Sequence, residues 1–361
     1  MKILHIHPSL ECGGIEAMIC SLANQMVKNH DVSVCTIYKP SDSDVFLHKL
    51  DKRISVYSLN KTNTGFSLVE IFKIFRFIRK HDFEVVHIHG FLYYYLFSIL
   101  FLRKHVKFVY TVHSDARMEN SKWDKRLLLI KKMFFQKKYL TPVTISNVSR
   151  TSFESYYKTS ACLIYNGIPK PAVYKGEDPL AAYRYTSETK VFLHLGRITK
   201  AKNQVMLCRV FDRLINTGED IVLVIAGSKQ DMSIYSEIQP FLSERIIYIG
   251  ECKEVTSLLK YSDAMCLSSI WEGLPITLLE AMSVGCIPIC TPVGGIPDIL
   301  ESDVNGLLSE DSSEESYYKA IRYFLTLSLD KIRQISNNAM FSFEKHDIVA
   351  TAEQYIKIYA S

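Results

Sequence analysis

Short β-rich runs alternate with longer helical patterns along the whole chain, and this alternation limits the possible folds more than any other feature. In the first half the predicted strands are Lys2–His7, Asp31–Tyr38, Glu84–His89, Phe108–His113 and Val143–Ser146. Helical patterns at Glu16–Asn29 and Leu68–Lys80 separate them. Because strands that alternate with helices are joined by crossover connections, we predict a parallel sheet with helices on both faces.

A second series of the same kind begins near residue 190. Its predicted strands are Val191–Gly196, Ile221–Gly227, Ile246–Gly250, Ala264–Leu267 and Cys286–Cys290, with a helix over Val205–Asn216. The Asn166–Gly167 pair and the prolines Pro169 and Pro171 lie between the two series and are typical of a domain boundary. We therefore predict an α/β protein of two doubly wound, Rossmann-like domains, 1–169 and 170–345, that face a cleft, followed by a helix over 346–361.

The composition excludes several other classes. The longest apolar run, Phe91–Leu102, is shorter than the roughly 20 residues that cross a bilayer. The apolar run within Met1–His7 is too short for a signal peptide and is predicted to be a strand. Nine cysteines without a Cys-x-x-Cys pair argue for a reducing cytosol and against a zinc knuckle. We therefore expect a cytoplasmic protein.

The stretch from Trp271 to Gly285 contains the strongest functional signal. The apolar run Ala264–Leu267 before it is predicted to be a buried strand, Pro275 lies where a first helical turn begins, and Gly285 ends the helix. Glu272 then lies in the strand-to-helix loop and Glu280 about one turn into the helix. The backbone N–H groups at this helix start form an anion site at the carboxyl end of a parallel sheet, where open α/β sheets bind ligands.

Two other loops are expected at the same cleft. The Gly13–Gly14 pair follows the first strand and precedes a helix, so its backbone allows close approach of a ligand. Arg197 and Lys202 follow the first strand of the second domain, and both side chains bind phosphate well. Since cations and amides suit a diphosphate and carboxylates accept hydrogen bonds from sugar hydroxyls, the set predicts a nucleotide-sugar site. The absence of Gly-x-Gly-x-x-Gly argues against a nicotinamide or flavin cofactor.

Taken in order, these elements resemble the large family of retaining glycosyltransferases with the GT-B fold called family 4. The resemblance covers nearly the whole chain. It rests on Gly13-Gly14-Ile15-Glu16, Thr111-Val112-His113, Asn166-Gly167-Ile168, Gly196-Arg197 with Lys202, Glu272-Gly273-Leu274-Pro275 with Glu280-Ala281-Met282, Gly285 with Pro288, and Gly294-Gly295. One departure is Asn203, where many members have glycine after the lysine.

The resemblance implies a role for each matched position. The implied donor-binding residues are Gly13, Gly14, Arg197, Lys202, Glu272, Gly273, Leu274, Pro275 and Glu280. Arg197 and Lys202 would hold the diphosphate, Glu280 the ribose and Glu272 the sugar hydroxyls. The implied catalytic residues are His113, beside the transferred sugar, and Glu272. No metal and no cofactor are expected, and the last helix, 346–361, is expected to cross back to the first domain.

The function implied is transfer of a hexosyl or N-acetylhexosaminyl group, with retention, from a nucleotide-sugar donor such as a UDP-sugar. The acceptor would be a glycan, lipid-linked, in the assembly of capsule, O-antigen or exopolysaccharide, and no nucleic-acid partner is expected. Two alternatives remain open at this point. A nucleotide-sugar epimerase of related fold would release a changed nucleotide sugar without an acceptor, and a non-catalytic glycan-binding subunit would release nothing.

The basic charge of the first half suggests a further partner. Residues 1–170 carry 25 Lys and Arg against 13 Asp and Glu, whereas residues 171–361 carry 18 against 25. Residues 122–138 alone have seven basic residues and one acid, with Trp123, Leu127, Ile130 and Phe134 at helical spacing. Such a helix either lies on an anionic membrane, making the protein peripheral on the inner face, or packs its apolar stripe on the core.

Overall fold

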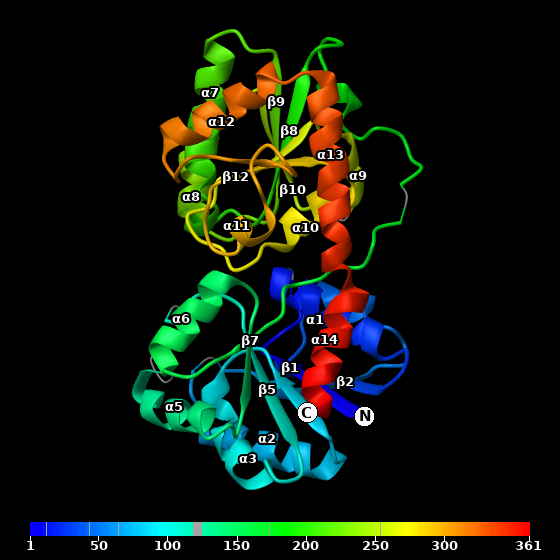
Figure 1. Cartoon of the computed structure of the whole chain (residues 1–361), viewed down its shortest axis with the longest axis vertical. Coiled ribbons are helices and arrows are strands. Elements are labelled where there is room, and N and C mark those ends of the chain that lie inside the picture. The colour runs from blue at the N-terminus through cyan, green and yellow to red at the C-terminus, as the bar shows by residue number, and fades with distance from the viewer. Residues whose placement is uncertain (12, 43, 64, 118–124, 173, 253) are drawn as a thin grey trace. The chain divides into compact units, whose positions relative to one another are not determined.

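The computed structural model describes residues 1–361 except 12, 43, 64, 118–124, 173 and 253. The chain divides into two compact units (Figure 1). Unit 1 comprises Met1–Pro169 together with Asp347–Ser361, and unit 2 comprises Lys170–His346. Each unit is built around its own parallel sheet, so the predicted α/β class is confirmed.

Unit 1 contains a seven-stranded parallel sheet with the strand order β3-β2-β1-β4-β5-β6-β7. Its strands are β1 Lys2–His7, β2 Asp31–Tyr38, β3 Ser55–Lys61, β4 Val85–Ile88, β5 Lys107–Val112, β6 Thr141–Thr144 and β7 Cys162–Leu163. The five predicted strands of this half are all present, each within two residues of its predicted ends. Because β1, β4 and β5 are adjacent and parallel, their carboxyl ends lie at one edge of the sheet.

Helices cover both faces of this sheet (Figure 1). They are α1 Gly14–Met26, α2 Leu68–His81, α3 Leu96–Leu102, α5 Leu128–Gln136, α6 Asn147–Tyr157 and α14 Ile348–Ala360. The core between helices and sheet is rich in aromatic residues, and Phe108, Phe135 and Phe153 are fully buried within it. Ring contacts such as Phe135–Phe153, at 4.9 Å between centroids, add to the burial of apolar area.

Unit 2 contains a six-stranded parallel sheet with the order β10-β9-β8-β11-β12-β13. The strands are β8 Lys190–Leu195, β9 Ile221–Ala226, β10 Ile246–Gly250, β11 Ala264–Leu267, β12 Ile287–Cys290 and β13 Leu307–Leu308. The helices are α7 Gln204–Asn216, α8 Met232–Ile238, α9 Val255–Tyr261, α10 Ile276–Ser283, α11 Ile296–Ile299, α12 Glu314–Thr326 and α13 Leu329–Phe343. The central strands β8, β9 and β11 are buried on both faces, as their continuous apolar sequences predict.

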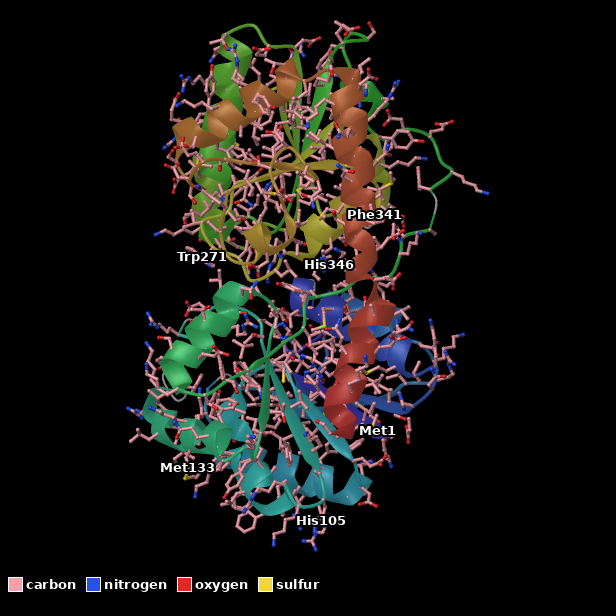
Figure 2. All side chains as sticks on the ribbon, in the orientation of Figure 1. Met1, His105, Met133, Trp271, Phe341 and His346 are labelled. Atoms are coloured by element: carbon pink, nitrogen blue, oxygen red, sulfur yellow. The ribbon has the colours of Figure 1, made fainter. Side chains whose placement is uncertain are left out.

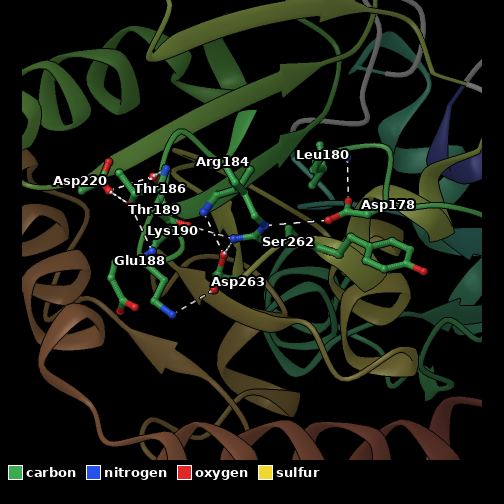
Figure 3. Close-up of polar contacts among 12 residues, drawn as sticks. Asp178, Leu180, Arg184, Thr186, Glu188, Thr189, Lys190, Asp220, Ser262 and Asp263 are labelled. Atoms are coloured by element: carbon green, nitrogen blue, oxygen red, sulfur yellow. Dashed lines mark hydrogen bonds and ion pairs between the residues drawn. The ribbon is translucent and has the colours of Figure 1, made fainter. Parts of the chain in front are cut away.

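The segment that leads into β8 is fixed to unit 2 by a polar network (Figure 3). Arg184 donates to the Asp263 carboxylate at 2.8 Å and to the Tyr261 carbonyl oxygen at 2.7 Å. Lys190 approaches the other oxygen of Asp263 at 3.3 Å, and the Asp220 carboxylate accepts from Thr186 and Thr189. The segment before β8 is therefore anchored to the amino-terminal edge of the second sheet.

The C-terminal helix α14 packs on unit 1 through two tyrosines. The Tyr359 hydroxyl lies 2.6 Å from His87 Nδ1, and the Tyr355 hydroxyl lies 3.1 Å from Thr111 Oγ1. Both tyrosine rings are buried, and α14 also contacts α1. The chain returns to unit 1 at the bridge between Ile168 and Asp347, where the Ile348 N–H donates to the Ile168 carbonyl oxygen.

Within the described residues, no helix combines the length and the apolar character needed to cross a bilayer.

Replacing Tyr359 by Phe tests the attachment of α14. The substitution keeps the buried ring but leaves the fully buried His87 Nδ1 without its hydroxyl partner, so we expect a loss of about 1–3 kcal/mol in unfolding free energy. Tyr323→Phe is the control, because its hydroxyl bonds Asp303 at the surface and its loss should have little effect. Equal urea midpoints for the two variants would contradict this account.

Candidate active site

An ion pair between Lys202 and Glu272 joins two of the loops that the sequence singled out. Lys202 Nζ lies 2.6 Å from Glu272 Oε1. Lys202 ends the short 3₁₀ turn η4, Lys200–Lys202, after β8, and Glu272 lies in the loop after β11. The Lys202 side chain is 20% exposed and that of Glu272 is 11% exposed, so this pair is shielded from water more than an ordinary surface ion pair. The predicted diphosphate cation and the predicted sugar-binding carboxylate therefore contact each other directly.

Hydroxyl groups at the end of β11 hold this pair in place. Ser269 Oγ donates to Glu272 Oε1 at 2.6 Å, and Ser268 Oγ donates to the Lys202 carbonyl oxygen at 3.0 Å. Thr291, which follows the adjacent strand β12, donates to the Ser269 carbonyl oxygen at 2.7 Å. Both serines and Thr291 are fully buried, so these bonds fix the loop with little competition from water.

The Gly294–Gly295 turn packs against the backbone of the Glu272 loop. Gly294 has φ +59, and a Cβ atom there would lie 2.1 Å from the Glu272 carbonyl oxygen. The Gly295 N–H donates to the Gly273 carbonyl oxygen. Only glycine fits at residue 294, because its backbone is left-handed and leaves no room for a side chain. The family pattern at these two glycines therefore has a structural reason in this chain.

Arg197 lies in the same loop as Lys202, directly after β8 and Gly196. Its side chain is exposed, while its carbonyl oxygen accepts from the buried Gln204 amide at 2.9 Å. Gln204 also contacts His194 Nε2 at 3.1 Å, and His194 Nδ1 donates to the Cys266 carbonyl oxygen at 2.9 Å. Burial lowers the pKa of His194 to about 4, so its ring is neutral and Nε2 accepts from Gln204.

Asn203 shows how the chain accommodates its departure from the family pattern. Its backbone is left-handed, with φ 54 and ψ 40, in the turn between η4 and α7. Glycine enters this region freely, and asparagine is among the few other residues that do so readily. The loop shape that glycine allows in other members is therefore compatible with asparagine here.

Helix α10 begins where the sequence predicted, with one difference at its first residue. Pro275 has φ −69 and ψ 127 and is the N-cap rather than the first helical residue. The helix ends at Ser283, and Gly285 follows with φ +75. Glu280 is half-buried in the second turn, and its carbonyl oxygen accepts from Ser283. Leu274, directly before Pro275, is buried.

The other predicted donor-binding turn, Gly13–Gly14, belongs to unit 1. Gly13 is the N-cap of α1. The Glu16 carboxylate, in the first turn of α1, lies so close that a Cβ atom on Gly13 would be 2.3 Å from Glu16 Oε2. The other oxygen of Glu16 is 3.4 Å from His7 Nε2. A carboxylate therefore lies at the helix start that the sequence assigns to a phosphate, which agrees with the preference of helix N-termini for anions.

His113 is one of a group of buried histidines at the carboxyl ends of β1, β4 and β5. His113 Nε2 lies 3.2 Å from His89 Nδ1, and His89 Nε2 lies 3.2 Å from His5 Nδ1. Burial lowers the pKa of His113 to about 3, and the nearby His7 contributes further. Burial also lowers the pKa of His5 to about 3 and that of His89 well below its ordinary value. The three rings are therefore neutral near neutral pH.

The two contacts couple the tautomers of these three rings. A neutral imidazole has one N–H and one acceptor nitrogen, so each contact needs a donor on one side and an acceptor on the other. Two arrangements satisfy both contacts, and they differ in whether His113 Nε2 accepts or donates. His5 is the last ring of this hydrogen-bonded row, and its Nε2 atom is buried without a hydrogen-bond partner among the described residues. A buried N–H without a partner is rarer than a buried acceptor without one, so we expect His5 Nε2 to carry no proton. His5 Nδ1 then donates to His89 Nε2, His89 Nδ1 donates to His113 Nε2, and His113 Nε2 is the acceptor.

Among the described residues, we considered two groups as possible metal ligands. The ligand atoms of His5, His87 and His89 all lie within 4.8 Å of one another. However, His87 is already bonded at both ring nitrogens, to Tyr359 at 2.6 Å and to Thr111 at 2.7 Å. The hydrogen-bond network thus satisfies His87 without an ion.

The second group is the Asp-x-Asp pattern formed by Asp42 and Asp44. Asp44 is buried, and its carboxylate accepts from the backbone N–H groups of Leu10 and Ser41. It therefore anchors the loop after β2, and nothing in its contacts points to a metal.

The predicted basic helix differs from its expected orientation. Its first residues, Lys122, Trp123 and Asp124, lie outside the described residues. In α5, Phe134 is buried and packs on the core as its stripe predicts, but Ile130 is exposed. Lys131 is buried instead, with its Nζ 5.6 Å from the centre of the Tyr157 ring. The predicted apolar stripe is therefore wrong at residue 130, because α5 buries Lys131 beside Tyr157 of α6 and leaves Ile130 exposed.

The sequence reasoning missed several residues that shape the site. They are Gln204, His194, Ser268, Ser269 and Thr291. One signal was present, since Ser268 and Ser269 directly follow a predicted buried strand at its carboxyl end. The contact between His89 and His113 depends on the strand order and register, which the sequence does not state.

Two substitutions at His89 test the coupled tautomers. His89→Asn keeps an amide donor near the Nδ1 position and should hold His113 with Nε2 unprotonated, whereas His89→Gln places its amide near the Nε2 position and should release His113. Long-range ¹⁵N–¹H NMR spectra of the ring nitrogens report the tautomer directly. Protonated Nε2 on His113 in the wild-type protein, or identical His113 spectra in the two variants, would contradict the coupling.

Comparison with known proteins places this site in a family. The family model described as Glycosyltransferase Family 4 matches residues 12–170, and the model described as Glycosyl transferases group 1 matches residues 181–340. A capsular polysaccharide biosynthesis glycosyltransferase of Staphylococcus aureus is 26% identical over 100% of this chain and 99% of its own length. An Escherichia coli UDP-Gal:α-D-GlcNAc-diphosphoundecaprenol α-1,3-galactosyltransferase is 28% identical, but the match covers 42% of this chain and only 40% of that enzyme.

The fold comparison agrees with the sequence comparison. The crystal structure of an Anabaena protein in complex with UDP and glucose superimposes with a TM-score of 0.82 at 17% identity, covering 100% of both chains. At this identity the likeness concerns the fold. Two family models that together match most of the chain, and a full-length glycosyltransferase relative, lead to one conclusion. The chain belongs to the glycosyltransferases of group 1, with the two-domain GT-B architecture.

Proposed function

We propose that this protein transfers a sugar, with retention of anomeric configuration, from a UDP-sugar to a lipid-linked glycan during assembly of a surface polysaccharide. The observation that carries the proposal is the loop pair of unit 2, where Lys202 and Arg197 follow β8 and Glu272 contacts Lys202 at 2.6 Å. Support for the donor comes from the Anabaena neighbour, which holds UDP and glucose. Support for the acceptor comes from the E. coli relative, whose name specifies a diphosphoundecaprenol-linked sugar.

The proposed reaction uses the unit 2 loops to stabilise the leaving group. The bond between the anomeric carbon and the donor phosphate oxygen breaks, and its electron pair stays on the diphosphate. Arg197, Lys202 and the amides at the start of α10 neutralise this charge as it develops. The acceptor oxygen bonds to the anomeric carbon from the same face, and its proton passes to the leaving phosphate. Positively charged side chains thus supply the stabilisation, so the proposed reaction requires no metal and no cofactor.

The remaining predicted residues position the donor. Glu280 on α10 accepts hydrogen bonds from the ribose, and Glu272 accepts from hydroxyls of the donor sugar. The Gly13–Gly14 turn contributes backbone amides to the phosphates, and His113 contacts the transferred hexosyl or N-acetylhexosaminyl group. Because burial lowers the pKa of His113 to about 3, this residue acts as a neutral hydrogen-bonding group rather than as an acid near neutral pH. The protein would work in the cytoplasm at the inner face of the membrane.

Kinetics of three single variants test the proposed function. Arg197→Ala and Lys202→Ala should each lose about 2–4 kcal/mol of transition-state stabilisation, measured from kcat/KM with UDP-sugars and a lipid-linked acceptor. Lys200→Ala is the matched control, because Lys200 is an exposed lysine of the same turn and has no assigned role. The assay contains excess chelator throughout. Wild-type rates for both Arg197 and Lys202 variants, or activity that depends on added magnesium, would contradict the proposal.

A further inference from the structure

Two neighbouring helices of unit 1, α2 and α3, expose a continuous row of apolar side chains. On α2, Leu68, Val69 and Phe72 face solvent, and Phe72 is 55% exposed. On α3, which packs beside α2, Leu100 and Phe101 are exposed, Phe101 to 59%. Ordinary surfaces carry such residues singly, whereas contiguous groups mark sites of interaction with proteins or membranes.

Ring contacts join the exposed residues of the two helices into one surface. The ring centroids of Phe72 and Phe97 are 5.4 Å apart, those of Phe75 and Phe97 are 5.1 Å apart, and those of Phe97 and Phe101 are 4.7 Å apart. We call this surface the aromatic ridge, and it consists of Leu68, Val69, Phe72, Phe75, Phe97, Leu100 and Phe101. Because the rings hold each other in place, the ridge presents a preformed apolar edge.

Basic residues outnumber acids along α2 and α3, and the exposed acids Asp82 and Glu84 follow at the end of α2. Residues 68–80 contribute four Lys or Arg and residues 96–107 contribute three, and the only acid in these two ranges is Glu70. Glu70 is itself buried and bonded to Lys73 at 2.9 Å. The cations are Lys73, Arg76, Arg79, Lys80, Arg103, Lys104 and Lys107. A surface with this balance favours a partner that carries many negative charges.

A basic pocket lies directly after α3. It has a volume of about 270 Å³, and four cations line it: Arg103, Lys104, Lys107 and Lys138. The Arg103 guanidinium is stacked over the Tyr139 ring at 4.1 Å and donates to the Leu100 carbonyl oxygen. Lys107 Nζ donates to the Ser361 carbonyl oxygen at 3.1 Å. Arg103 is only two residues from Phe101, so the pocket and the aromatic ridge form one continuous surface at the amino-terminal edge of β5 and β6.

We propose that the aromatic ridge and the basic pocket together dock unit 1 on an anionic lipid bilayer. The exposed rings enter the boundary between headgroups and acyl chains, and the pocket binds the phosphate of one anionic phospholipid headgroup. Basic residues near such a surface attract its anionic headgroups, so the cations of the ridge and the pocket give attachment that salt weakens. The inference deepens the proposed function, on which it rests for its purpose, because a lipid-linked acceptor lies in a membrane.

The helix α5 is an alternative candidate for the membrane contact, and the experiment must distinguish it from the aromatic ridge. It exposes Leu129, to 81%, and Met133, and the basic residues Lys125, Arg126 and Lys137 lie near them. Figure 2 labels Met133 on α5 and His105 in the turn after α3, at separate places on unit 1. Lys131 is buried and the α5 rings Phe134 and Phe135 lie in the core, so the described part of α5 exposes the aliphatic side chains Leu129, Ile130 and Met133 but no phenylalanine, whereas the aromatic ridge exposes Phe72 and Phe101.

Flotation of the full chain with vesicles tests the docking surface. Wild-type protein should float with vesicles that contain phosphatidylglycerol at low salt, and poorly with pure phosphatidylcholine or at high salt. The ridge variant Phe72→Ser with Phe101→Ser should lose at least about tenfold in bound fraction, since two exposed aromatic anchors are removed. The pocket variant Lys104→Glu with Lys138→Glu changes only exposed side chains and should lose the preference for anionic vesicles.

The matched control is Leu129→Ser with Met133→Ser on α5, which should float like the wild type. Melting curves and UDP-sugar hydrolysis, measured on the same preparations, separate loss of docking from loss of folding or of catalysis. Wild-type flotation of both the ridge and the pocket variants would overturn the proposal, as would loss of binding in the α5 control alone. Normal flotation of a wild-type protein that binds no nucleotide would leave the docking surface standing and refute the proposed function.

Discussion

The contact between Lys202 and Glu272 is the interaction on which the geometry of unit 2 depends. It connects the loop after β8 to the loop after β11. Ser269 donates a hydrogen bond to Glu272, and Thr291 donates one to the Ser269 carbonyl oxygen. A partly buried pair of this kind is costly to break on one side, because the remaining charge stays desolvated. Any anion that binds Lys202 therefore has to compete with a carboxylate that is already well placed. If the proposed roles hold, the same competition would favour a donor that brings both a phosphate for Lys202 and hydroxyls for Glu272.

Unit 1 repeats this principle with different residues. The Glu16 carboxylate lies at the start of α1, beside the Gly13–Gly14 turn, and its other oxygen approaches His7. In both units a carboxylate thus lies beside the group that the sequence assigns to phosphate. Each carboxylate thus has a polar partner within the protein, and the contact helps to hold the loop beside it in place.

The apolar strands and the long helices could be predicted from the sequence, because the spacing of their apolar residues indicates which positions are buried. Ala264–Leu267 and Asp31–Tyr38 were predicted to the residue. The strand β3 was missed because it is half-exposed at the edge of the sheet and has no apolar alternation, and β7 and β13 contain only two residues each. The helix at 128–136 was expected, but the side that it buries was not. Burying Lys131 in place of Ile130 costs little, because the apolar stem of a lysine can pack along an aromatic ring while its charged end stays near the ring.

In the candidate site, residues in loops after predicted strands could be identified from the sequence, whereas contacts between side chains of different strands could not. Arg197, Lys202 and Glu272 could be named because they lie in loops at the ends of predicted strands. The contact from His89 to His113 could not be named, because it requires β4 beside β5 in a particular register. The support from Gln204 was equally hidden, since a buried glutamine at a helix start has no signature until the loop around it is known.

Calorimetric titration of UDP into three variants measures the competition at Lys202 most directly. If Glu272 holds the lysine against the diphosphate, Glu272→Gln should bind UDP more tightly than the wild type, because the amide carries no charge but still accepts from Ser269. Lys202→Met should bind UDP more weakly, and the double variant should lose the gain of Glu272→Gln. Weaker UDP binding by Glu272→Gln, or a gain that persists without Lys202, would contradict the account.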